Sequence, residues 1–189
     1  GSTNTIITSM YQEHGVTPSP KMAGLMAAAI LSDTVMFKSP TCTKKDIAMA
    51  ERLARIARIS LKDLGRELFS STSDGKSAEE LLGTDYKEFH ISGQTIGVGQ
   101  ITCVDSSKLV ERRDEFIAAM EKVKQNSNCD LVILMITDVL LDGSHIFYVG
   151  SDDVMQEAFS TVPKDKHMFL PKVMSRKKQI IPMLTAMWG

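Results

Sequence analysis

The chain has 189 residues, of which 43% are hydrophobic and 24% are charged. This length and apolar fraction suffice for one ordinary domain or two small ones with packed cores. The 22 Lys and Arg residues nearly balance the 23 Asp and Glu residues, and the net charge of −1 argues against a strongly basic nucleic-acid-binding protein. No apolar run approaches the roughly 18 to 20 residues that span a membrane. The scattered cysteines indicate reduced thiols in a cytoplasmic protein; they are Cys42, Cys103 and Cys129.

The first third of the chain has helical patterning. Apolar residues recur over 3–11, and Ser19 with Pro20 predicts the start of a helix that is apolar on almost all sides through residue 31. Thr43 and Asp46 form a capping-box pattern at the start of another helix. Residues 60–69 predict one more helix, so this part of the chain is mainly helical.

Small polar residues at 70–76 predict a linker and a domain boundary. Beyond the linker, alternating or continuous apolar residues predict strands at 86–91, 95–104, 131–136 and 145–149. Glycines at 97 and 99 suggest a bulge or a close approach in the second of these strands. We expect Ser106 or Ser107 to cap a long helix after that strand. The second part therefore reads as an α/β domain with a mixed β-sheet flanked by helices.

A cluster of cations near the end of the chain is the first candidate site. Arg176, Lys177 and Lys178 follow Ser175 between two apolar segments. The planar guanidinium of arginine can bind two phosphate oxygens, and lysine supplies a compact charge, so the cluster suits a polyanion. The alternative is a solvated positive turn or the start of a helix.

Asp33 and Lys87 are two further candidates. Asp33 follows an apolar run, and a buried carboxylate is costly unless it is paired or bound to a metal such as Mg²⁺ or Mn²⁺. The alternative is that Asp33 or Ser32 caps the following turn. Lys87 shares a strand face with Asp85, where an exposed ion pair is the simple interpretation. The four histidines are scattered, and these residues alone do not form a complete metal site.

Four segments carry a family resemblance: LSDT at 31–34, KSPTCT at 38–43, DYKEF at 85–89 and SRKKQ at 175–179. In this order and spacing, the chain resembles the family II inorganic pyrophosphatases of the DHH phosphoesterase superfamily over nearly its whole length. The resemblance implies hydrolysis of pyrophosphate to two phosphates with Mn²⁺, Co²⁺ or Mg²⁺. It further implies that residues 1–69 are the C-terminal helical part of a DHH domain, 70–76 a linker and 77–189 a DHHA2 domain.

The resemblance also implies roles for single residues. Asp33 matches the carboxylate that bridges two catalytic metals, which activate a water as the nucleophile. Lys87, Arg176 and Lys177 match the cations that bind pyrophosphate, and closure about the linker would assemble the site. If the three cations form one pocket, we expect them to bind phosphate, sulfate or pyrophosphate weakly even without metals.

The metal ligands that the family has upstream of these segments, including its DHH motif, are missing from this sequence. We therefore expect the 189-residue chain alone to be inactive. We also expect the helix at 21–31 to expose an apolar face, which would favour a homodimer.

Two alternative functions remain open on the sequence. One is an exopolyphosphatase or another DHH-family phosphoesterase, although a longer substrate would require a wider basic track or stacking aromatic residues. The other is a non-catalytic phosphate-binding module.

Overall fold

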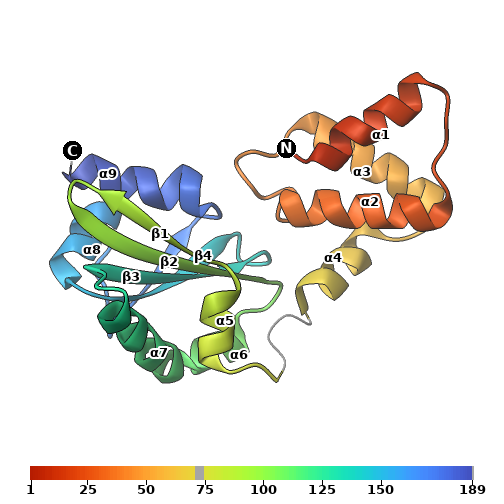
Figure 1. Ribbon diagram of the computed structural model, residues 1–189. Coiled ribbons are helices and arrows are strands. Elements are labelled where there is room, and N and C mark those ends of the chain that lie inside the picture. The colour runs from red at the N-terminus through yellow and green to blue at the C-terminus, as the bar shows by residue number, and fades with distance from the viewer. Residues whose placement is uncertain (71–74, 189) are drawn as a thin grey trace. The chain divides into compact units, whose positions relative to one another are not determined.

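The computed structural model describes residues 1–70 and 75–188 and divides the chain into two compact units, Gly1–Thr72 and Ser73–Gly189 (Figure 1). Residues 71–74 of the predicted linker lie outside the described residues. In the described part of the chain, no helix is long and apolar enough to cross a membrane.

Residues 1–70 of the first unit form helices, as predicted, with bounds α1 (Thr3–Glu13), α2 (Pro20–Asp33), α3 (Lys44–Ala57) and α4 (Leu61–Ser70). Ser2 caps α1 and Ser19 caps α2, because each hydroxyl accepts a hydrogen bond from a backbone N–H of the first turn. The capping box of Thr43 and Asp46 is present at the start of α3, which confirms that prediction.

The core of the first unit lies between α2 and α3. The side chains that α2 and α3 bury together are Ala23, Met26, Ala27, Ile30, Ala50 and Leu53. Because α2 is apolar on almost all sides, this contact covers only part of it. Met22 and Leu25 are 46% and 60% exposed, so α2 does expose apolar side chains, as expected.

The second unit contains a five-stranded sheet in the order β1-β2-β3-β4-β5 among its described residues. Its strands are β1 (Tyr86–Ile91), β2 (Gln94–Cys103), β3 (Leu131–Asp138), β4 (Gly143–Val149) and β5 (His167–Pro171). The pair β2 and β3 is parallel and the other neighbouring strands are antiparallel, so the sheet is mixed, as predicted.

Helices cover both faces of this sheet (Figure 1). One face packs against α5 (Ala78–Thr84), α6 (Ser107–Glu111) and α7 (Arg113–Asn126). The other face packs against α8 (Asp152–Phe159), the π-helix η1 (Arg176–Ile180) and α9 (Ile181–Trp188). Strand β3 is buried at every position, because its alternate residues enter both cores.

The prediction of one long helix capped by Ser106 or Ser107 is wrong. The segment forms two helices, α6 and α7, and Ser106 makes no capping hydrogen bond. Its backbone N and its Oγ instead donate to Asp138 Oδ2 at 2.9 and 2.7 Å. Ser106 therefore binds the buried carboxylate at the end of β3 and does not cap α6.

Candidate functional site

Asp33 is the last residue of α2, and its carboxylate is exposed rather than buried. Its Oδ2 accepts a hydrogen bond from Ser2 Oγ at 2.6 Å. Within the described residues, its Oδ1 has no hydrogen-bond partner. The following turn is held by Thr34, whose hydroxyl accepts from Phe37 N at 3.2 Å, so the alternative that Asp33 or Ser32 caps this turn is not what the structure shows.

The turn after Asp33 has an unusual backbone. Val35, Met36 and Phe37 have φ values of 51°, 51° and 68°, although none is glycine. Left-handed backbone costs a non-glycine residue about 1–2 kcal/mol. The buried hydroxyl of Thr34 offsets part of this cost, since it also donates to Ile30 O at 2.6 Å. Helix α2 therefore ends at Asp33, whose carboxylate is exposed and whose following turn is held by the hydrogen bonds of Thr34.

A buried carboxylate, Asp46, lies close to Asp33, since both bond to Ser2, and the capping-box pattern does not predict this second role of Asp46. Its Oδ1 accepts from Ser2 N and Thr5 Oγ1, and its Oδ2 accepts from the backbone N and Oγ1 of Thr43. Burial alone would raise the pKa of Asp46, but these hydrogen bonds outweigh burial and hold its pKa well below the usual range. Asp46 thus binds the N-terminal ends of α1 and α3 as an anion.

Arg176, at the start of η1, is only 8% exposed and its charge is paired. Its Nη2 donates to Asp85 Oδ1 at 2.8 Å, and its Nη1 donates to the carbonyl oxygens of Asp85 and Val98. These contacts bear on two of the sequence predictions. The basic cluster does start a helical turn, and Asp85 forms its ion pair with Arg176 rather than with Lys87.

Lys87 lies on β1 opposite Val98 of β2, the residue whose carbonyl oxygen accepts a hydrogen bond from Arg176. It projects from the same face of β1 as Phe89, which packs in the core that includes Ile180 of η1, because alternate residues of a strand share a face. Lys177 follows Arg176 and is exposed. Within the part of the chain that the structure describes, neither Lys87 nor Lys177 has an ion-pair partner. Arg176 thus bonds to the carbonyl of the residue that pairs with Lys87 across the strands, and Lys177 follows Arg176 in the chain.

Gln179 holds the backbone that leads into this cluster. Its side-chain oxygen accepts from Met174 N and Ser175 N at 2.8 and 2.9 Å, and its amide nitrogen donates to Lys172 O at 2.9 Å. Ser175 caps the turn by accepting from Lys178 N. The last residue of the SRKKQ segment therefore fixes the position of the cations before it.

The described residues contain no group of three or more His, Cys, Asp or Glu side chains arranged to hold a metal ion. An exposed carboxylate with one oxygen available, as in Asp33, fits the oxygen ligands that Mn²⁺ and Mg²⁺ prefer. Asp33 can thus supply one ligand, and the other ligands of a complete site are not among these residues.

Two of the four histidines are not isolated, which corrects the expectation from the sequence. His145 Nδ1 lies 2.9 Å from His167 Nε2, across β4 and β5. Burial lowers the pKa of both imidazoles, and for His167 the neighbouring His145 lowers it further. Two nitrogens that face each other at this distance share one proton, so the pair is typical of a neutral structural contact.

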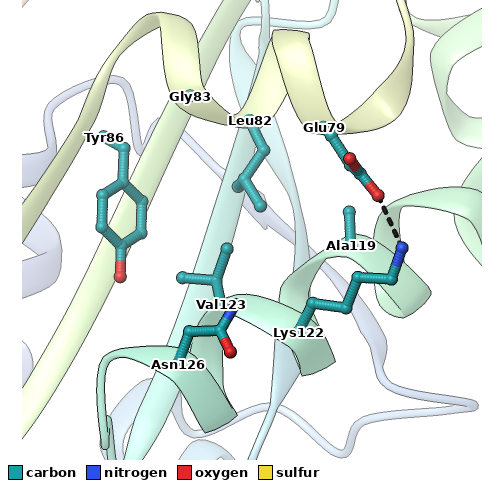
Figure 2. A pocket seen from close by; sticks show the side chains of 8 residues that line it. All are labelled: Glu79, Leu82, Gly83, Tyr86, Ala119, Lys122, Val123 and Asn126. Atoms are coloured by element: carbon teal, nitrogen blue, oxygen red, sulfur yellow. Dashed lines mark hydrogen bonds and ion pairs between the residues drawn. The ribbon is translucent and has the colours of Figure 1, made fainter.

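A pocket of about 240 Å³ lies on the other side of β1, between α5 and α7 (Figure 2). Figure 2 shows mostly apolar groups, with the Tyr86 ring at one end and Lys122 bonded to Glu79 at the rim. Its one cation is already paired, and Lys87 projects from the opposite face of the strand. This pocket therefore does not fit a polyanion.

Comparison with known proteins agrees with this fold. The chain is 43% identical to a manganese-dependent inorganic pyrophosphatase of Methanothrix thermoacetophila over 97% of its own length and 61% of that protein. It is 39% identical to a cobalt-dependent inorganic pyrophosphatase of Clostridium perfringens, over 98% of its own length and 34% of that protein. It thus spans less than two thirds of the length of these relatives.

A solved structure and a domain family also match. A crystal structure from Methanococcus jannaschii, assigned to the family II inorganic pyrophosphatases, aligns with a TM-score of 0.83 at 34% identity and covers 100% of this chain and 65% of that one. Residues 66–187 match the family described as the DHHA2 domain, and this range includes Lys87, Arg176 and Lys177. The chain therefore belongs to the DHHA2 domain family.

Proposed function

We propose that the chain is the C-terminal portion of a cytoplasmic, manganese-dependent inorganic pyrophosphatase, with Co²⁺ or Mg²⁺ as possible substitutes for Mn²⁺. The observation that supports the proposal is the bond from Arg176, which precedes Lys177, to the carbonyl of Val98, the cross-strand partner of Lys87, in a chain 43% identical to a pyrophosphatase of that kind. The three free cysteines are consistent with a reducing compartment.

In this proposal, residues 77–189 act as the DHHA2 domain and supply the cations for the substrate. Lys87 and Lys177 bind the oxygens of pyrophosphate and neutralise the charge that grows on them as the bridging P–O bond breaks. Among the described residues, Arg176 has its Nε–H and one N–H of Nη2 left for an anion, because its other three N–H groups bond to Asp85 and Val98. Those three hydrogen bonds keep the guanidinium in place.

Residues 1–69 act, in the same proposal, as the helical end of a DHH domain and supply Asp33. Its carboxylate would be one of the ligands of Mn²⁺, because Oδ1 has no hydrogen-bond partner among the described residues. When bound, the metal supplies Lewis-acid activation of a water molecule. Because one carboxylate cannot hold two metal ions, we expect the 189-residue chain alone to hydrolyse no pyrophosphate and to bind phosphate with millimolar affinity at best.

The test compares substrates on the intact protein that carries this chain. We expect Mn²⁺-dependent release of phosphate from pyrophosphate, removed by Asp33→Asn, and at least about tenfold lower activity on long-chain polyphosphate. A preference for polyphosphate would favour an exopolyphosphatase. Phosphate binding without turnover of either substrate would favour a non-catalytic phosphate-binding module, and both results would contradict the proposal.

A further inference from the structure

We propose that Ser2 is a positioning residue for the carboxylate of Asp33, and that the buried Asp46 fixes Ser2 for this task. The inference rests on the proposed function, because it assigns to Asp33 the role of a metal ligand. It adds two residues, from the start of α1 and the start of α3, that orient this ligand without touching the metal or the substrate.

The first step concerns the single proton of the Ser2 hydroxyl. Ser2 Oγ accepts from Asn4 N at 3.2 Å as the N-cap of α1. Its proton is therefore free to point away from the helix, and the acceptor there is Asp33 Oδ2 at 2.6 Å. A hydrogen bond of this length to a charged oxygen is a strong one. It leaves Oδ1 of Asp33 available for a cation.

The second step concerns what holds Ser2 in place. Ser2 is 4% exposed, and its backbone N donates to Asp46 Oδ1 at 3.1 Å. Asp46 is 1% exposed, and Thr5 and Thr43 supply its remaining donors. Ser2 is therefore bonded to a buried carboxylate whose four hydrogen bonds join the N-terminal ends of α1 and α3. These bonds fix the backbone of Ser2, and with it the position of the hydroxyl.

The third step concerns Asp33 from its other side. The hydrogen bonds of Thr34 fix the backbone next to Asp33, so the side-chain rotamer of Asp33 is the remaining degree of freedom. The Ser2 hydroxyl sets it. Ligating carboxylates in metal sites are themselves hydrogen-bonded, and loss of such a partner typically weakens metal binding by about 10–100-fold.

The experiment measures Mn²⁺ affinity in the intact protein by electron paramagnetic resonance of the free ion, alongside denaturant unfolding. Ser2→Ala removes the hydroxyl, and Ser2→Gly removes it with little loss of capping energy. Ser19→Ala is the matched control, because Ser19 caps α2 with a bond of 3.2 Å to Met22 N and has no contact with Asp33. Asp33→Asn reports on the metal ligand itself.

We expect both Ser2 variants to raise the Kd for Mn²⁺ by about 10-fold or more, and Ser19→Ala to change it less than about twofold while costing similar stability. Equal Kd values in the Ser2 and Ser19 variants, in a protein where Asp33→Asn weakens Mn²⁺ binding, would overturn the positioning role alone. Unchanged Mn²⁺ binding in Asp33→Asn would overturn this inference together with the metal-ligand role in the proposed function.

Discussion

The imidazoles of His145 and His167 make the second unit sensitive to acid. Burial lowers the pKa of both groups in the folded protein, so the unfolded chain binds protons more readily as the pH falls through about 6.5. The free energy of unfolding should therefore decrease between pH 7.5 and pH 5.5. Denaturant titrations at both values check this, with His167→Gln as the comparison. A decrease of the same size in that variant would contradict the assignment to the pair.

Gly97 and Gly83 should respond in opposite directions to replacement by alanine. A Cβ at Gly97 would collide with the hydroxyl of Tyr86, which lies against this position of β2. Gly97→Ala should therefore destabilise the protein by about 1–3 kcal/mol. Gly83 lies in α5 with nothing near its Cβ position, so Gly83→Ala should be neutral or stabilising by up to about 1 kcal/mol. Denaturant unfolding distinguishes the two signs.

Contacts between residues far apart in the sequence are the part of the structure that the sequence patterns do not predict. Local spacing indicates an ion pair between Asp85 and Lys87, but Asp85 pairs with Arg176, which is 91 residues away. The contact of His145 with His167 depends in the same way on the register of β4 and β5. Such partners are brought together by tertiary folding, and the local spacing of residues does not predict them.

At the scale of elements, Asp46 joins α1 to α3. Asp46→Asn turns one acceptor oxygen into a donor that faces donors, inside a buried site, so we expect a loss of about 2–4 kcal/mol. Asp63→Asn, at an exposed position in the first turn of α4, is the control and should cost less than about 1 kcal/mol. Equal losses in guanidinium unfolding would show that Asp46 acts only as an ordinary helix cap.

The elements that the sequence predicted best are those with local signals. The Ser19 cap with Pro20, the capping box, and the fully apolar β3 all appear where the pattern placed them. Local spacing does not show the break between α6 and α7 at Arg112, nor the bond from Ser106 to Asp138, which joins residues 32 positions apart. The sequence patterns also do not predict the π-helical turn at η1, where the Gln179 side chain bonds to three backbone groups.

At the scale of the whole molecule, we predict a homodimer through exposed apolar side chains of the first unit. Leu25 is 60% exposed, and on α1 Ile6 and Met10 are 61% and 53% exposed. Exposed apolar groups of this size favour association. Sedimentation velocity of the 189-residue chain should show a dimer that Leu25→Glu converts to monomer without loss of stability. A monomer at high concentration in the unmodified chain would contradict this prediction.

Kinetics of Lys177→Gln in the Mn²⁺-loaded intact protein test the central claim most directly. Lys177 lacks an ion-pair partner in the described residues and follows Arg176, and the adjacent exposed Lys178 is a matched control. We expect Lys177→Gln to lower kcat for pyrophosphate by about 100-fold with a smaller change in KM, because the charge that it meets grows in the transition state. Lys178→Gln should stay within about threefold of wild type. Equal kcat values for the two variants would contradict the account.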